Sequence, residues 1–285
     1  MIKISGFRYC RLGTANLSET IKFATEIIGL ELVDQKDGFA YLRCDDSDHN
    51  VVYFQGDPED HTIGLSLDTF EELDAAESRL EAIGRPVYRG TDSEAEARRC
   101  MGYINFKDTS GNSIDLSVRP FASGTRYFPS RDAGITEFSH IGLRVTDPRE
   151  AEKFWSQEFN FRTSDWIGWS ALMTFDEVHH RYALFPSNKP GIQHVNFQVA
   201  ETDDIMKSNY FLRDRQVRIQ AGPGRHSLSG ARFVYYYGPD NMIYEYSCGV
   251  RMVDENWEPR QFPINEASFC AWGSKPDLDI LESES

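Results

Sequence analysis

Five of the seven histidines in this sequence fall between residues 140 and 226, and their pattern suggests a metal site. His140 and His194 each open a segment of β-strand character, and Glu245 lies inside the run Met-Ile-Tyr-Glu-Tyr. A carboxylate buried in such a run is costly unless it is paired or bound to a metal ion. Two imidazoles and one carboxylate that leave the other coordination positions vacant form the ligand set of non-haem Fe(II) oxygenases. We therefore predict that His140, His194 and Glu245 bind a divalent metal. The alternative is that the histidines simply pack and Glu245 faces solvent.

Further candidate residues lie around these three positions in the sequence. His226 ends a Gly-Pro-Gly-Arg-His turn, and Tyr235 precedes Glu245 across a Gly-Pro-Asp turn. His180 stands before an alternating segment, and the adjacent His179 is expected to point the opposite way. Four more residues are candidates for lining a substrate pocket: Trp169, Leu172, Phe175 and Ser229. Because side chains alternate along a strand, only some of them can face such a pocket.

The sequence contains one pattern twice. The segment Phe7–Phe23 matches Phe138–Phe154, and two later pairs of segments match at a similar spacing of about 130 residues. Three matches in one order indicate two copies of the same unit. The alignment places three residues of the first copy at the positions of the predicted metal ligands: Tyr9, His61 and Asp115. We expect that the first copy binds no metal.

Helix caps and periodicity predict the elements that must position these residues. Asp147, Pro148 and Glu150 fit the N-cap, N1 and N3 positions of a helix with an apolar side. The matching helix of the first copy opens at Asn16, and a second helix begins at about Thr69. Each copy is predicted to run strand, helix, several strands, and then strand, helix and strands again. These alternations predict an α+β fold.

Composition limits the partners of the chain. It has 285 residues and a formal net charge of −15, which disfavours binding to nucleic acid or to an anionic membrane surface. No apolar stretch approaches the ~20 residues needed to span a bilayer. The N-terminus lacks the pattern of a secretory signal, and the five cysteines are scattered and odd in number. These features predict a cytoplasmic protein with no nucleic-acid and no membrane partner.

The two copies predict two domains joined by a linker. We expect an N-terminal domain without metal over residues 1–120, and a linker rich in Gly, Ser, Pro and Arg over residues 121–135. The catalytic C-terminal domain is predicted over residues 136–250. Residues 251–285 are expected to form a tail whose aromatic side chains pack on the body and whose acidic end frays.

The sequence as a whole resembles the type I extradiol ring-cleavage dioxygenases of the vicinal oxygen chelate superfamily, also called the glyoxalase, bleomycin resistance and dioxygenase superfamily. The likeness covers about residues 3–250. The C-terminal signature of the family is matched at four places: Gly224-Arg225-His226, Val234-Tyr235, Pro239 and Glu245. Gly238 and Asn241 depart from it at turn positions. The resemblance implies tandem βαβββ modules, paired in each of two domains to form an open, funnel-shaped mixed barrel.

The resemblance also implies roles for the candidate residues. His140, His194 and Glu245 would bind Fe(II), although Mn(II) accepts the same ligands. His180 would face the oxygen site, with a one-residue ambiguity left by His179, and His226 and Tyr235 would bind the substrate hydroxyls. The family habit of oligomerising implies a homo-oligomer.

The implied reaction is the cleavage of a catechol-type aromatic diol with O₂, both atoms of which enter the product. His180 would stabilise negative charge on oxygen and then donate a proton. Family members that cleave acidic catechols have an arginine where this sequence has Ala221, which favours an alkyl-, aryl- or hydroxyl-substituted ring. Two alternatives are a non-oxidative metal-dependent lyase or isomerase on the same scaffold and a metal-free binding module.

Overall fold

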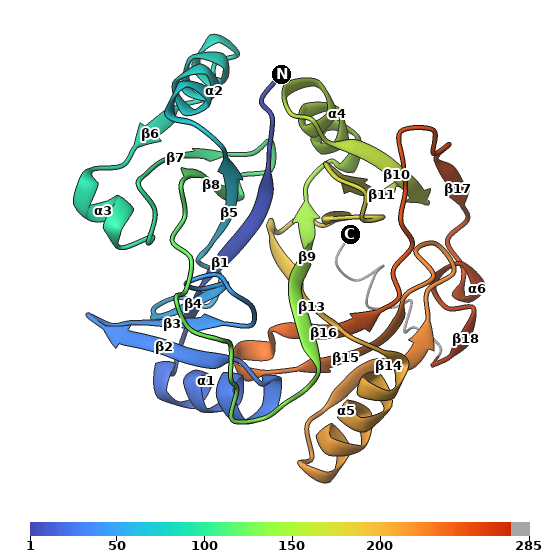
Figure 1. Cartoon of the computed structure of the whole chain (residues 1–285). Coiled ribbons are helices and arrows are strands. Elements are labelled where there is room, and N and C mark those ends of the chain that lie inside the picture. The colour runs from blue at the N-terminus through green and yellow to red at the C-terminus, as the bar shows by residue number, and fades with distance from the viewer. Residues whose placement is uncertain (275–285) are drawn as a thin grey trace.

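The computed structural model describes residues 1–274 and contains two curved β-sheets that lie side by side (Figure 1). The first sheet has the strand order β2-β3-β4-β1-β5-β8-β7-β6. Its elements in chain order are β1 (Gly6–Thr14), α1 (Leu17–Phe23), η1 (Ala24–Ile28), β2 (Glu31–Lys36), β3 (Phe39–Arg43), β4 (Val51–Gln55), β5 (His61–Leu67), α2 (Phe70–Ala82), β6 (Val87–Arg89), α3 (Asp92–Glu96), β7 (Gly102–Lys107) and β8 (Ser113–Val118).

The second sheet has the order β17-β10-β11-β12-β9-β13-β16-β15-β14-β18. Its elements are β9 (Ile135–Val145), α4 (Pro148–Glu158), β10 (Arg162–Ile167), β11 (Ser170–Thr174), β12 (Tyr182–Pro186), β13 (Gly191–Val199), α5 (Thr202–Asp214), β14 (Ile219–Arg225), β15 (Arg232–Tyr237), η2 (Pro239–Asn241), β16 (Ile243–Cys248), β17 (Arg260–Phe262), α6 (Glu266–Phe269) and β18 (Trp272–Gly273). The last three come from the tail.

Each sheet is built from two βαβββ modules. The first strand of a module pairs in parallel with its last strand, as in β1 with β4, β5 with β8, β9 with β12 and β13 with β16. The two modules of a sheet meet through an antiparallel pair, β1 with β5 or β9 with β13. A parallel return needs a crossover connection, which the helix of each module begins. The predicted α+β class with tandem βαβββ modules is confirmed.

The predicted helix starts have a physical basis in side-chain caps. The Asp147 carboxylate accepts hydrogen bonds from the backbone N–H groups of Arg149 and Glu150 at the start of α4. Asn16 caps α1, and Thr69 forms a capping box with Glu72 at the start of α2. Such a cap stabilises a helix by about 1 kcal/mol. The first helix differs from the expectation in its last turn, which widens into the π-helical segment η1.

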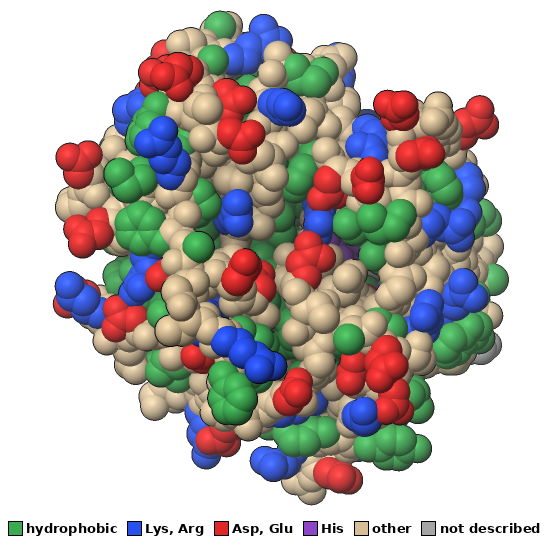
Figure 2. Space-filling view, in the orientation of Figure 1, with side chains coloured by type: hydrophobic (Ala, Val, Ile, Leu, Met, Phe, Trp, Pro, Cys, Tyr) green, Lys and Arg blue, Asp and Glu red, His purple; other side chains and the backbone are tan. Residues whose placement is uncertain are grey.

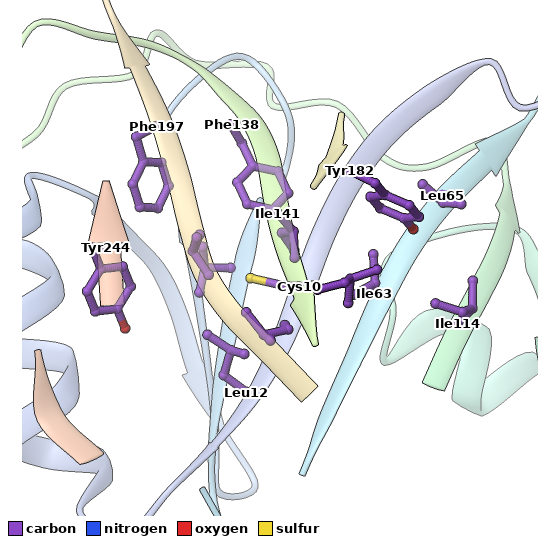
Figure 3. Packing of buried hydrophobic residues seen from close by; sticks show 14 of the residues in the cluster. Cys10, Leu12, Ile63, Leu65, Ile114, Phe138, Ile141, Tyr182, Phe197 and Tyr244 are labelled. Carbon is purple, nitrogen blue, oxygen red and sulfur yellow. The ribbon is translucent and has the colours of Figure 1, made fainter. Parts of the chain in front are cut away.

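One large apolar core extends across both sheets (Figure 3). Cys10 and Ile63 of the first sheet and Ile141 and Phe197 of the second are fully buried members of this cluster. Across the boundary, the Phe7 and Phe138 rings stack with centroids 4.7 Å apart. Two buried hydroxyls, those of Tyr53 and Tyr244, also hydrogen-bond between the sheets at 2.7 Å. The two repeats therefore hold each other in a fixed relative position.

The described part of the tail lies against the second sheet. Strand β17 pairs in parallel with β10, and β18 pairs with β14. The Trp257 indole N–H donates to the backbone carbonyl of Ser164 at 2.7 Å. The acidic end that was predicted to fray lies outside the described residues. None of the helices within residues 1–274 has the length and apolar character needed to cross a membrane.

Candidate active site

The three predicted metal ligands converge in the second sheet. The Nε2 atoms of His140 and His194 lie 3.0 Å apart, and the Oε2 atom of Glu245 lies 3.0 Å from the first and 3.5 Å from the second. All three side chains are buried. Ligands that are 90° apart around an ion at about 2.1 Å would be separated by about 3.0 Å. Two nitrogens and one carboxylate oxygen in this arrangement fit a divalent metal with three adjacent positions left free.

Strand register brings these three residues together. His140 on β9 lies opposite Asn196 on β13, and Asn196 lies opposite Glu245 on β16. Residues opposite one another in adjacent strands point to the same face of a sheet. His194 stands two residues before Asn196 on β13 and therefore shares that face. Three neighbouring strands thus supply one donor each.

Neighbouring polar groups hold the ligands in the state that a metal requires. The Gln193 side-chain carbonyl accepts the Nδ1–H of His194, which leaves His194 Nε2 unprotonated toward the cluster. Asn196 Nδ2 donates to Glu245 Oε2 at 2.7 Å. Burial lowers the pKa of His194 to about 3, so this imidazole is neutral at pH 7. Burial by itself would raise the pKa of Glu245, but the imidazoles of His140, His226 and His194 around it hold this pKa well below its usual range.

Tyr235 and His226 flank the carboxylate. Tyr235 on β15 lies directly opposite Glu245 on β16, because the turn through Gly238 closes the two strands into a hairpin. His226 Nδ1 donates to the backbone carbonyl of Phe269 in the tail at 2.9 Å. Its Nε2 atom therefore carries a lone pair and accepts from the Tyr235 hydroxyl at 3.1 Å. Burial raises the pKa of Tyr235 well above its usual value, which keeps this hydroxyl protonated.

His180 approaches the ligands from another direction. Its ring centroid lies 4.3 Å from that of His140, and its side chain lines the pocket above the cluster. The sequence predicted that His179 points the opposite way from His180. His179 is not among the residues that line the pocket, and it is fully buried behind His180. There its Nδ1 lies 3.2 Å from His180 Nδ1, and its Nε2 lies 2.8 Å from the Asp165 carboxylate.

An apolar pocket opens above the metal ligands. Figure 2 shows histidine surface deep in a hollow on the face of the molecule. Besides His180, His194, His226 and Tyr235, the pocket is lined by these residues: Ile167, Leu172, Ala183, Phe185, Leu228, Ser229 and Phe269. Of the four residues proposed for the pocket, Leu172 and Ser229 are among these lining residues.

The other two proposed pocket residues, Trp169 and Phe175, were placed wrongly. Trp169 sits in the turn between β10 and β11, where it is 59% exposed and stacks with the guanidinium of Arg149 at 3.8 Å. Phe175 has the strand parity of Met173, which is in the core, and it packs edge-on against Phe161. Leu172 has the opposite parity and faces the pocket. The apolar pattern of the sequence did not reveal which face was which.

The equivalent place in the first sheet is filled by protein groups. Tyr9 on β1 lies opposite Gly64 on β5, which lies opposite Asp115 on β8, so Tyr9 and Asp115 correspond to His140 and Glu245. The Tyr9 hydroxyl donates to Asp115 at 2.9 Å, and Arg98 Nε donates to the same oxygen at 2.7 Å. The guanidinium of Arg98 thus compensates the buried carboxylate that a metal ion would otherwise bind.

The predicted equivalence of His61 and His194 was wrong by one residue. Strand register places Thr62 at the position of His194, because it stands two residues before Gly64 as His194 stands two before Asn196. His61 hydrogen-bonds instead to Asn112 Oδ1 at 3.1 Å. A shift of one residue turns a side chain to the other face of a strand.

Four residues around the ligands were not found from the sequence: Asp165, Gln193, Asn196 and Phe269. Asp165 and Phe269 are far from the ligands along the chain and reach the site only through strand pairing and the return of the tail. Gln193 and Asn196 flank His194, but neutral amides carry no signal for metal chemistry. Asn196 could have been noticed as a polar residue on the same face of the strand as His194.

Comparison with known proteins agrees with this geometry. The family model described as "Glyoxalase/Bleomycin resistance protein/Dioxygenase superfamily" matches residues 6–116 and 137–246. The chain belongs to this superfamily. The resemblance inferred from the sequence is therefore confirmed, and each sheet of the structure corresponds to one of the two matched segments.

Relatives within the superfamily align along most of the chain. A biphenyl-2,3-diol 1,2-dioxygenase of Sphingomonas paucimobilis is 25% identical over 90% of this chain and 92% of its own. A 1,2-dihydroxynaphthalene dioxygenase of Sphingobium xenophagum is 26% identical over 88% and 90%. An iron-dependent extradiol dioxygenase of Rhodococcus jostii (strain RHA1) is 25% identical over 95% and 97%. The crystal structure of a halotolerant catechol dioxygenase superposes with a TM-score of 0.88, at 26% identity, over 99% of this chain and 97% of the other.

Proposed function

We propose that this chain is an extradiol ring-cleavage dioxygenase that opens a catechol-type aromatic diol with O₂. The observation that carries this function is the buried cluster of His140, His194 and Glu245 beneath an apolar pocket. The relatives named above are dioxygenases that act on diols of this kind, or are described as extradiol enzymes.

The donor set and its surroundings suit Fe(II). Two neutral imidazoles and one ionised carboxylate are offered from one side, and Mn(II) accepts the same set. When bound there, the metal would supply a place where a deprotonated diol and O₂ meet and exchange electrons. Gln193 and Asn196 would keep the donors aimed at that place, because each holds one ligand by a hydrogen bond.

His226 and Tyr235 are proposed to bind and orient the diol. Phe269 holds the Nδ1–H of His226, so the Nε2 lone pair, which accepts from Tyr235 in this structure, would instead accept a proton or a hydrogen bond from a substrate hydroxyl. Tyr235 stays protonated and would donate to the substrate oxygen once that oxygen has lost its proton. Together they fix which ring oxygen lies beside Glu245.

On the opposite side of the pocket, His180 is proposed to accept a proton from the substrate and to return it later in the reaction. Burial and the nearby His140 hold the pKa of His180 well below its usual value, so the imidazole is neutral before the diol arrives. A neutral imidazole accepts the proton that the diol releases on binding. The resulting imidazolium stabilises negative charge on oxygen and returns the proton as the ring opens. No external reductant is needed, because both oxygen atoms enter the product.

The pocket favours a ring with an uncharged apolar substituent. Within residues 1–274, the side chains that line the pocket and its adjoining hollow include no Lys, Arg, Asp or Glu. Ala221, at the position of the arginine in relatives that cleave acidic catechols, faces this adjoining hollow. A substrate carboxylate would lose its hydration there without gaining a cation. We therefore propose alkyl- or aryl-substituted catechols as the substrate class.

Oxygen consumption tests this function against its alternatives. Protein reconstituted with Fe(II) under anaerobic conditions is offered catechol, 3-methylcatechol and 2,3-dihydroxybiphenyl, and O₂ uptake and visible absorbance are recorded. One O₂ consumed per diol, with a yellow ring-opened product, is expected. A lyase or isomerase would change its substrate without O₂ uptake, and a binding module would retain the diol unchanged. Either result with iron-loaded protein would refute the proposal.

The remaining proposals concern the setting in which the enzyme works. We propose a cytoplasmic homo-oligomer whose N-terminal domain spans residues 1–120 and whose catalytic domain spans residues 136–250. The relatives reported above support the diol and O₂ as its small-molecule partners. Sedimentation velocity on the metal-loaded protein tests the oligomeric state, and a single species of 32.7 kDa would refute it.

A further inference from the structure

A chain of hydrogen-bonding groups leads from His180 into the protein interior, away from the pocket. His180 Nδ1 lies 3.2 Å from His179 Nδ1, and His179 Nε2 lies 2.8 Å from Asp165 Oδ2. Arg260 from the tail completes the chain with a hydrogen bond to each oxygen of this carboxylate. His179, His180 and Asp165 are all buried. The pocket, the metal ligands and the substrate partners account for none of these inner groups.

The protonation state of Asp165 follows from its surroundings. Its Oδ1 accepts from the backbone N–H and the Nε of Arg260 at 2.9 and 3.0 Å, and its Oδ2 accepts from Arg260 Nη2 at 2.5 Å and from His179. Four donors aimed at two oxygens leave no room for a proton on the carboxyl group. Burial alone would raise the pKa of Asp165, but the hydrogen bonds from His179 and Arg260 lower it. Asp165 is thus an ionised group that can only accept.

This carboxylate dictates the arrangement of protons on both histidines. Since Asp165 only accepts, His179 must carry its proton on Nε2. Burial lowers the pKa of His179, so the ring is neutral and its Nδ1 has a lone pair. The 3.2 Å contact between the two Nδ1 atoms then requires that His180 carries its proton on Nδ1. Of the two tautomers of a neutral His180, this contact selects the one in which Nε2, the nitrogen that remains for a ligand in the pocket, carries the lone pair.

We propose that Asp165 and His179 are positioning residues that hold His180 in one tautomer, with Nε2 free to accept the proton of the substrate. This inference rests on the role proposed above for His180. The proton would pass from the diol hydroxyl to His180 Nε2 and return to the opening ring, while the proton on His180 Nδ1 stays in its hydrogen bond to His179. Arg260 ties this arrangement to the tail, since β17 brings it opposite Asp165 on β10.

The substitution Asp165→Asn provides a sharp test because it can reverse the direction of the hydrogen bonds between residue 165, His179 and His180 without removing a side chain. The Asn side chain can donate to His179 Nε2, which moves the proton of His179 to Nδ1 and that of His180 to Nε2. We expect kcat to fall roughly 10²-fold or more, whereas iron content and anaerobic binding of the diol stay at the wild-type level. His179→Gln can still accept from His180 Nδ1 and donate to Asp165, so it should retain far more turnover than His179→Leu.

A matched control comes from the first sheet. Asp115 is also fully buried and paired with an arginine, at 2.7 Å from Arg98, but it lies on β8 of the first sheet, whereas the metal ligands lie on the second. Asp115→Asn is expected to change stability without changing turnover. Equal losses of turnover in Asp165→Asn and Asp115→Asn would show a merely structural effect and overturn the proposal.

The tautomer can be observed without turnover. In ¹⁵N-labelled protein loaded with Zn(II), which is diamagnetic, the ring nitrogens of His180 are assigned by comparison with His180→Asn. We expect an unprotonated Nε2 in the wild type and a protonated Nε2 in Asp165→Asn. An unprotonated Nε2 in both proteins, or wild-type kcat in Asp165→Asn, would overturn the proposal. Absence of ring cleavage by the wild type would instead refute the proposed function, and the NMR result would stand separately.

Discussion

Removing the arginine that replaces a metal ion in the first sheet should destabilise the fold and leave the metal site intact. Asp115 is fully buried and accepts hydrogen bonds from Tyr9, Asn105 and Arg98 at 2.9, 2.8 and 2.7 Å. In Arg98→Met the carboxylate keeps two neutral donors but loses its compensating cation. Breaking a buried ion pair from one side costs about 3–5 kcal/mol. We expect a loss of this size in the free energy of unfolding.

The reverse substitution should cost less. In Asp115→Asn the Arg98 guanidinium loses its carboxylate, but its side chain is 17% exposed and it stacks over the Tyr103 ring at 3.8 Å. Water and the ring compensate part of the charge, so we expect a loss of about 1–3 kcal/mol. The double variant removes both charges and should be clearly more stable than the sum of the two single losses predicts.

Urea unfolding of the metal-depleted proteins, followed by circular dichroism, measures these free energies, and elemental analysis of the reconstituted proteins measures their metal content. If the free energy of unfolding of Arg98→Met falls by less than about 0.5 kcal/mol, the ion pair contributes no more than an exposed one does, and the reasoning is refuted. Loss of the metal in any of the three variants would show that the first sheet, rather than the second, contributes to the metal site.

Four further predictions concern the second sheet. His140→Ala or Glu245→Ala should abolish binding of Fe(II), measured by elemental analysis, because each removes one of three buried donors; retained iron would exclude that residue as a ligand. His180→Ala should keep iron and anaerobic diol binding but lower kcat by roughly 10²-fold or more in stopped-flow turnover with O₂; a normal rate would remove its proposed role. Ala221→Arg should raise kcat/KM for 2,3-dihydroxybenzoate relative to 3-isopropylcatechol by about tenfold, since it supplies the missing cation; an unchanged ratio would refute this account of selectivity. Burial holds the pKa of His194 at about 3, below the ~6.5 of an unfolded histidine. The stability that neutral His194 lends the metal-depleted fold is therefore complete above about pH 6.5 and is lost toward pH 3. The free energy of unfolding should decrease as the pH is lowered through this range, and a flat profile would contradict the prediction.

The sequence was sufficient for features that depend on local chemistry and on repetition. Helix starts could be predicted at Asn16, Thr69 and Asp147 because a cap needs only a side-chain oxygen and the next few backbone N–H groups. The two-copy architecture followed from matched segments. The ligand set His140, His194 and Glu245 was recognisable because few other roles require two histidines and a glutamate at those strand positions.

Strand register and the path of the tail required the tertiary structure. The offset that linked His61 to His194 was wrong by one residue, and only the pairing of β5 and β13 with their neighbouring strands shows that Thr62 holds the equivalent position. Trp169 and Phe175 were apolar and close to the correct strand, but parity and a turn directed them away from the pocket. Phe269 and Arg260 reach the site only because the tail folds back onto the second sheet.

The amino-acid sequence by itself therefore determined which chemical groups are present, where the helices begin and that two homologous halves exist, because each of these is encoded in short stretches of chain. Only the tertiary structure decided that Asp165 stands behind His179 and that Arg98 fills the place of a metal ion. Those contacts join residues from separate strands and loops, and a hydrogen bond or an ion pair depends on differences of a few tenths of an ångström that no spacing along the chain specifies.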